Sequence, residues 1–309
     1  MQILRLQPIF QSTVWGGTAL VDFAYKEAPK QAGECWGISA HSHGDCLIAN
    51  GEYKGRTLSW CYANRRELFG NLKDAVFPLL VKVIGAEKDL SIQVHPDDAY
   101  AMEREHGSLG KTECWYILDC KKDASIVIGH HARNKKELQE YIEEGRFREL
   151  IRELPIQPGD FFHIEPGCLH AIKGGTLLLE TQQSSDVTYR VYDYDRLSNG
   201  KKRTLHTKES IDCICTPHVD YPLQPETIGL SGAMITTYVS CPYFTVQKWS
   251  IEGEFWTHNC HPFINVSVIE GAGTCNEEEI KKGDHLIITS QTESVLLTGS
   301  MVLIVSFVR

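Results

Sequence analysis

Short apolar runs rich in β-branched and aromatic residues recur along most of the chain, separated by Gly, Asp, Pro or Lys residues. Such runs are typical of strands, because these side chains suit a pleated surface and turn residues bound it. We therefore predict strands over residues 77–86, 113–120, 124–129, 174–182, 188–195, 243–251, 263–271, 285–290, 294–299 and 301–308. Many short strands with little helix indicate a mainly β protein, built as a sandwich or barrel.

Two segments show helical periodicity instead. Apolar residues recur near helical spacing over residues 134–154, with Gly145 as a break, and over the shorter segment 59–70. We predict small helical insertions at these two places in an otherwise β-rich chain.

An internal repeat becomes visible when the turns are aligned. "IQPGDFFHI" at residues 156–164 resembles "IKKGDHLII" at 280–288, and in each copy a second glycine follows the first after sixteen residues. These glycine pairs are Gly159 with Gly175 and Gly283 with Gly299. A shared period with shared turn residues indicates two copies of one β unit. We therefore expect two domains, over residues 1–225 and 226–309.

The two copies differ in their polar residues. His170 and Glu180 of the first copy correspond by spacing to Ser294 and Ile304 of the second. We infer that the first copy carries the chemistry and that the second supports it.

Composition and charge exclude several classes of function. The net charge of -9 disfavours nucleic acid, and it means that an anionic ligand must be held by a few lysines and arginines. No apolar run approaches the ~20 residues that span a bilayer, and the first residues lack a secretory pattern. The eleven cysteines include no CxxC pair, so we expect reduced, mostly buried thiols and a cytoplasmic location.

Gln93 and His95 stand two residues apart in the strand-like stretch "SIQVHPDD", residues 91–98. Side chains two apart on a strand point to the same face, so this pair projects together while Ile92 and Val94 point the other way. The proline after His95 ends the ladder of hydrogen bonds. The pair is either half of a metal site or two polar residues that face water.

Other polar residues of the first copy also occur in strand-like surroundings. Lys111 and Glu113 share a face, His170 follows a Pro-Gly turn, Glu180 follows three leucines, and Arg190 stands among aromatic residues. A carboxylate, two imidazoles and an amide oxygen suit a divalent ion, above all zinc. Three strong ligands leave a position open for water or substrate. Taken singly, each residue fits an ordinary solvated position, whereas their occurrence together in one copy favours a site.

Several motifs carry a resemblance to a known family. "LSIQVHPDD", "GKTECWYIL", "PGCLHAI" and "ETQQSSDVTYRVYDYDR" resemble, in order, signatures of the type I phosphomannose isomerases, a zinc-dependent family with the cupin fold. "TVWGG" and "GECWGIS" resemble the opening of the same family, and the match weakens after about residue 196. The short interval between Glu113 and His170 is similar to the compact bacterial form, and Tyr194 replaces a tryptophan that the family often has.

The resemblance implies a fold and a set of residue roles. It implies two cupin, or jelly-roll, β units: a catalytic one over residues 1–225, with the helical insertion near 134–154, and a degenerate one over 226–309. One zinc ion per chain would be held by Gln93, His95, Glu113 and His170. The catalytic residues would be Arg190, Glu180 and Lys111, and the substrate-binding residues Lys82, Ser91, Glu34 and Trp15. Without the resemblance, Lys82 would be interpreted as a surface lysine.

The implied activity is the interconversion of mannose 6-phosphate and fructose 6-phosphate, a reaction of mannose metabolism. We expect the protein to be a monomer or a weak homo-oligomer. A proton moves between C1 and C2 through a cis-enediol, with zinc as a Lewis acid and Arg190 holding the oxyanion or the phosphate. We expect Glu180 to be the base, because partial desolvation raises a carboxyl pKa, with Lys111 as the second choice. The alternative is that Glu180 only pairs with Arg190.

Two other functions fit parts of the pattern. A non-catalytic metal-binding cupin that senses a sugar phosphate is expected to have lost a ligand or the pair of Glu180 and Arg190, and this sequence keeps them all. An iron-dependent oxygenase usually needs two histidines in a facial triad, which the Gln-x-His pair fits less well. The isomerase is therefore the leading hypothesis.

Overall fold

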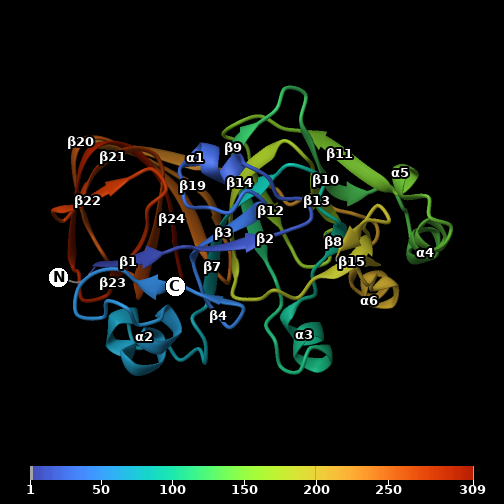
Figure 1. The fold of residues 1–309 in the computed structure, drawn as a ribbon, viewed down its shortest axis with the longest axis horizontal. Helices are drawn as coiled ribbons and strands as arrows, with labels where there is room; N and C mark the ends of the chain where they lie inside the picture. The colour runs from blue at the N-terminus through green and yellow to red at the C-terminus, as the bar shows by residue number, and fades with distance from the viewer. Residues whose placement is uncertain (1–2, 199, 309) are drawn as a thin grey trace.

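The computed structural model describes residues 3–198 and 200–308, and the strands in these ranges form three large β-sheets (Figure 1). The five-stranded sheet has the order β11 (Ile151–Pro155), β10 (Ser125–His130), β13 (His170–Ile172), β8 (Ile92–Val94), β15 (Tyr189–Tyr192). The six-stranded sheet has the order β12 (Phe161–Ile164), β9 (Glu113–Cys120), β14 (Thr176–Gln183), β7 (Leu79–Ala86), β3 (Ala32–Ile38), β2 (Ile9–Ser12). The predicted mainly β fold class is confirmed.

The third sheet contains the C-terminal strands and curls at one end of the molecule (Figure 1). Its order is β18 (Glu226–Leu230), β19 (Ala233–Ser240), β20 (Thr245–His258), β24 (Ser294–Phe307), β21 (Phe263–Cys275), β23 (His285–Thr289), β1 (Ile3–Gln7), β6 (Leu47–Ile48), with β22 (Glu278–Lys281) beside β21. Two small ladders join β4 (Ala40–His41) to β5 (Gly44–Asp45) and β16 (Leu197–Ser198) to β17 (Lys201–Lys202).

The six-stranded sheet lies between the other two, and the alternation of side chains along its strands explains why. On β14, Leu179 packs with residues of the C-terminal sheet, whereas Leu178 packs with residues of the five-stranded sheet. On β7, Val83 and Ile84 divide in the same way. Strands buried on both faces appear as continuous apolar runs, as in the "LLL" of β14.

The internal repeat predicted from the turns is present in the strand order. The order β12–β9–β14–β7 in the first copy matches β23–β21–β24–β20 in the second. The turns match as well: Asp160 accepts a hydrogen bond from the backbone N–H of Gln157 at 2.8 Å, and Asp284 accepts one from that of Lys281 at 3.0 Å. One β unit is therefore built twice with the same turn chemistry.

Three strands of the second copy continue where glycines led us to predict ends. The strands predicted over 294–299 and 301–308 are one strand, β24, and β20 and β21 also run beyond their predicted ends. Gly299 pairs with Gly253 on one side and with Gly273 on the other, so three glycines lie side by side across the sheet. A Cβ on Gly273 would stand 2.0 Å from the carbonyl oxygen of Thr298. These glycines therefore bend the sheet instead of ending its strands.

The helical predictions are confirmed in part. The segment 134–154 holds α4 (Lys135–Glu143) and α5 (Phe147–Leu150), separated at Gly145 with φ of +68°, but it ends in strand β11. Residues 151–154 extend because they pair with β10. The segment 59–70 holds α2 (Leu58–Asn64) and a 3₁₀ turn, η1 (Arg66–Phe69). The helices that we did not predict are α1 (Ala19–Phe23), α3 (Asp98–Arg104) and α6 (Thr207–Cys213).

The N-terminal residues pair with the C-terminal sheet. Strand β1 lies antiparallel to β23, with Ile3 opposite Ile288, and Leu4 and Leu6 are buried in the core between the sheets. The division predicted at residue 225 stays a prediction. Strand β1 belongs by sequence to the first predicted domain, but it pairs within the sheet formed by strands of the second.

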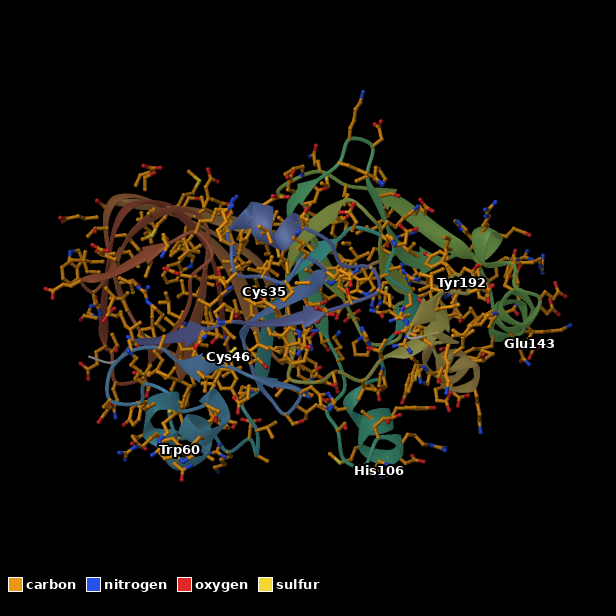
Figure 2. All side chains as sticks on the ribbon, viewed as in Figure 1. Cys35, Cys46, Trp60, His106, Glu143 and Tyr192 are labelled. Atoms are coloured by element: carbon orange, nitrogen blue, oxygen red, sulfur yellow. The ribbon has the colours of Figure 1, made fainter. Side chains whose placement is uncertain are left out.

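The cysteines are free thiols, as predicted. All eleven lie in the described part of the chain; six are buried, and Cys215 and Cys260 are exposed. Figure 2 shows Cys35 and Cys46 in the middle of the molecule, where both belong to the core between the sheets. Among the residues that the structure describes, no helix is long and apolar enough to cross a bilayer.

His285 joins the two copies and makes stability depend on pH. Its ring is buried, with Nε2 2.7 Å from the hydroxyl of Tyr25 and Nδ1 2.8 Å from that of Ser267, and burial lowers its pKa to about 4. The unfolded chain therefore binds an additional proton below pH ~6.5, and stability falls as the pH drops from there to about 4.

We expect His285→Gln to remove this dependence. Between about pH 7 and about pH 5, the wild-type protein should lose about 2 kcal/mol more unfolding free energy than the variant. Urea unfolding at both pH values measures the difference, and His258→Gln, at an exposed position, is the control. Equal losses in wild type and His285→Gln would contradict the assignment.

Candidate metal centre and active-site cavity

Two rows of paired residues face each other between the five-stranded and six-stranded sheets. In the five-stranded sheet, Gln93 of β8 lies opposite both His170 of β13 and Arg190 of β15. In the six-stranded sheet, Glu180 of β14 lies opposite both Trp115 of β9 and Lys82 of β7. Directly opposed residues on neighbouring strands project to the same face. The registers therefore gather polar side chains at one end of an interior that is otherwise apolar.

Three buried side chains form a compact cluster within this interior. Glu113 has one oxygen 3.5 Å from His95 Nε2 and the other 3.4 Å from His170 Nε2. All three residues are at most 1% exposed. As alternation predicts, Ile92 and Val94 point away from this cluster into the core beneath the helices.

Backbone carbonyls orient both imidazoles toward the carboxylate. His95 Nδ1 lies 2.8 Å from the carbonyl oxygen of Val187, and His170 Nδ1 lies 2.9 Å from that of Cys168. Since a carbonyl only accepts, each Nδ1 donates a proton and each Nε2 keeps its lone pair. Such second partners hold histidine ligands in place in metal sites.

Gln93 completes the set of possible ligands. Its side-chain amide lies 3.2 Å from His170 Nε2. Within the described residues, His95 Nε2 and Glu113 Oε1 are buried without a hydrogen-bond partner. Buried acceptors that face one another without a proton are costly, and a cation in their midst offsets that cost. The cluster therefore fits a metal ion held by nitrogen and oxygen donors.

Electrostatics in the cluster favour uncharged imidazoles. Burial lowers the pKa of His170 to about 4 and that of His95 well below its usual value. Burial and then the charge of Glu180 raise the pKa of Glu113, and Lys111, whose Nζ is 2.8 Å from Glu113, opposes them. Both histidines are thus in the form that binds metal at neutral pH.

A cavity of about 170 Å³ opens beside the cluster. Eight of the eleven predicted site residues line it: Trp15, Glu34, Lys82, Ser91, Gln93, Lys111, Glu180 and Arg190. The other three are the buried residues of the cluster. A larger cavity, of about 800 Å³, lies elsewhere and is lined by none of the eleven.

Lys82 is buried between two carboxylates. Its Nζ lies 3.5 Å from Glu34 and 3.3 Å from Glu180, and the side chain is only 8% exposed. The interpretation as a surface lysine is therefore wrong, because β7 is covered on both faces. Its contact with a sugar phosphate stays a prediction, and two carboxylates already balance its charge.

Glu180 is ionised, contrary to our expectation of a raised pKa. Burial does raise its pKa, but Lys111 and Lys82 outweigh burial and bring it to about 2. Trp115 Nε1 also donates to Glu180 at 3.0 Å. The alternative, a pairing of Glu180 with Arg190, is absent from the ion pairs of the described residues, since Lys82 from the neighbouring strand takes that place.

Arg190 offers unused donors at the edge of the cavity. It is half-buried, and its Nη1 donates to the carbonyl oxygen of Thr204 at 3.1 Å. Its Nε has no hydrogen-bond partner among the described residues. Burial and the nearby Arg203 lower its pKa. An anion in the cavity would satisfy this guanidinium.

Besides three aliphatic residues, sequence reasoning missed four residues that line the cavity, which are Trp36, Asp186, Thr188 and Arg203. Asp186 and Thr188 lie in the quoted motif between Glu180 and Arg190, so their position in the motif could have identified them. Trp36, whose ring lies 5.1 Å from Lys82 Nζ, occurs in "GECWGIS". Arg203 follows a turn outside any motif and gave no signal.

Comparisons with known proteins agree with this geometry. The family described as "Phosphomannose isomerase type I, catalytic domain" matches residues 3–119, and "Mannose-6-phosphate isomerase, cupin domain" matches residues 234–308. The mannose-6-phosphate isomerase ManA of Bacillus subtilis is 46% identical over 98% of both chains. The crystal structure of the mannose 6-phosphate isomerase from Bacillus subtilis, 46% identical, superposes over 100% of both chains with a TM-score of 0.98. A zinc-bound mannose 6-phosphate isomerase, 16% identical over 100% of both chains, has the same fold with a TM-score of 0.80.

Proposed function

This chain belongs to the type I phosphomannose isomerase family, and from that premise we propose that it interconverts mannose 6-phosphate and fructose 6-phosphate. The observation that carries the proposal is the buried cluster of His95, Glu113 and His170, with a cavity beside it that presents three acids, two lysines and two arginines. An aldose–ketose isomerisation needs these parts: an electrophile, a group that moves a proton, and a cationic grip on phosphate.

The proposed cofactor is one zinc ion per chain, held by Gln93, His95, Glu113 and His170. Support comes from the two lone pairs directed at a carboxylate and from the absence of hydrogen-bond partners for His95 Nε2 and Glu113 Oε1 among the described residues. When bound, zinc supplies Lewis acidity to a sugar oxygen on which negative charge develops.

We assign the proton transfer to Glu180, with Lys111 as the alternative. The base removes the proton from C2 of mannose 6-phosphate, leaving a cis-enediol, and returns it to C1 while a hydroxyl proton passes from O2 to O1. Lys111 and Lys82 keep Glu180 ionised and able to accept a proton, although a pKa of about 2 makes it a weak base in the free protein. An anionic substrate raises that pKa toward a value suited to catalysis.

Arg190 is proposed to bind the oxyanion or the phosphate. Its Nε lacks a partner among the described residues, and its strand position places it beside Gln93. Ser91, Glu34 and Trp15 are proposed to form the wall of the sugar pocket, since all three line the cavity. The cytoplasmic location and the state of monomer or weak homo-oligomer stay predictions.

A coupled assay tests the proposal. Fructose 6-phosphate formed from mannose 6-phosphate is measured before chelation, after chelation and again after zinc is restored. We expect the activity to disappear with the chelator and to return with zinc, because the cluster lacks a cation after chelation. Protein that holds a full complement of zinc and has no activity would contradict the isomerase and favour a sensor of sugar phosphates, for which binding of mannose 6-phosphate is then measured.

A further inference from the structure

A second group of metal donors lies at the rim of the cavity. His41 ends β4, His43 lies in the two-residue turn between β4 and β5, and Asp186 lies in the loop between β14 and β15. Among the residues that the structure describes, only this group and the buried cluster bring three His, Cys, Asp or Glu donor atoms within 4.8 Å of one another. The proposed reaction uses neither histidine.

The three side chains converge with one carboxylate between two imidazoles. His43 Nδ1 lies 2.5 Å from one oxygen of Asp186, and His41 Nε2 lies 3.6 Å from the other. The centres of the two rings are 5.0 Å apart. Two imidazoles and a carboxylate that approach from two separate chain segments are a donor set for zinc and neighbouring transition metals.

Both segments are held in place, which favours a built site. The loop that carries Asp186 is anchored because Gln182 Nε2 donates to the carbonyl oxygen of Ser185 at 2.5 Å and Ser185 Oγ donates to that of Leu109 at 2.8 Å. His41 packs edge-on against the ring of Trp36, with 5.8 Å between ring centres. Donors on restrained segments lose little entropy when they bind a metal.

We propose that His41, His43 and Asp186 form a second divalent-metal site, at the rim of the cavity and distinct from the buried cluster. It accepts zinc, cobalt or a similar transition metal, with positions open to water. The hydrogen bond between His43 and Asp186 is replaced by bonds from both residues to the ion.

Two features make this site weaker than the buried cluster. The backbone N–H of His43 donates to His41 Nδ1 at 3.2 Å, and binding through Nε2 requires a proton on Nδ1, so that hydrogen bond is lost. The side chain of His43 is also 70% exposed, so water competes for the metal.

Cobalt binding to the zinc-loaded protein tests the proposal. Full-length protein is loaded with zinc, desalted to retain the tightly bound ion, and dialysed against cobalt; both metals are then counted per chain. We expect one zinc and one cobalt in wild type, and one zinc without cobalt in His43→Ala. Asp186→Asn should lose the cobalt in the same way.

The control is His258→Ala, which removes an exposed histidine from β20, and it should keep one cobalt. The substitution at His43 lies in an exposed turn, so folding is not at risk. Wild type that binds no cobalt, or His43→Ala that still binds one, would overturn the proposal. The readout is bound metal, so the result is independent of isomerase activity.

Discussion

We expect His170→Ala to lose the proposed zinc ion and the turnover together. The substitution removes one of the two imidazoles of the cluster, and alanine supplies no donor atom in its place at this fully buried position. Loss of groups that only orient a ligand already weakens metal binding about 10–100-fold, so loss of the ligand itself should exceed that. Zinc content after desalting and the coupled assay for fructose 6-phosphate measure the two effects, and circular dichroism shows whether the variant folds.

The internal repeat supplies a matched control for this variant. Ser294 holds the corresponding place in the second copy, near the start of β24. Ser294→Ala should keep the zinc and the wild-type rate, because the substitution leaves in place its backbone carbonyl, which accepts a hydrogen bond from Asn276 Nδ2 at 2.9 Å. A folded His170→Ala protein that retains zinc through desalting would show that the buried cluster does not bind the metal.

Lys82→Met will destabilise the folded protein by about 3–5 kcal/mol, as expected when one partner of a buried ion pair is removed. The variant leaves Glu34 and Glu180 without their shared counter-charge, and Glu180 is 3% exposed. Burial alone would lower the pKa of Lys82, but the charges of these two glutamates raise it above its usual value. Urea unfolding near pH 7 measures the loss.

Lys248→Met is the control in the second copy. Lys248 pairs with Ile304 in the ladder where Lys82 pairs with Glu180, so it has no carboxylate opposite it. Its replacement should change stability by no more than about 0.5 kcal/mol. Equal effects of the two substitutions would mean that Lys82 contributes through packing and not through charge.

Side-chain alternation was sufficient to predict how the ligands lie. Gln93 and His95 share a face because a strand has a period of two, and that rule needs no knowledge of the partner strand. Their meeting with Glu113 and His170 follows from strand register across two sheets, which local pattern does not contain. The resemblance to a family supplied that link.

The errors of prediction have physical causes of the same kind. The pKa of Glu180 was expected to be raised by burial, but its value depends on lysines from β7 and from the segment just before β9, whose distance the sequence does not give. Gly299 was interpreted as a strand end, because a bend made by three glycines from different strands looks like a turn in any one of them. The rim histidines were missed because a hairpin and a distant loop bring them to Asp186.

The pairing of β1 with β23 has a consequence for how the protein folds during its synthesis. Chains are synthesised from the N-terminus at about 5–20 residues per second, so the first strand leaves the ribosome some tens of seconds before the residues that pair with it. Until then, Leu4 and Leu6 lack the residues of the C-terminal sheet with which they pack in the folded protein. The C-terminal sheet is therefore completed by a contact of very long sequence separation, a kind of contact that slows folding.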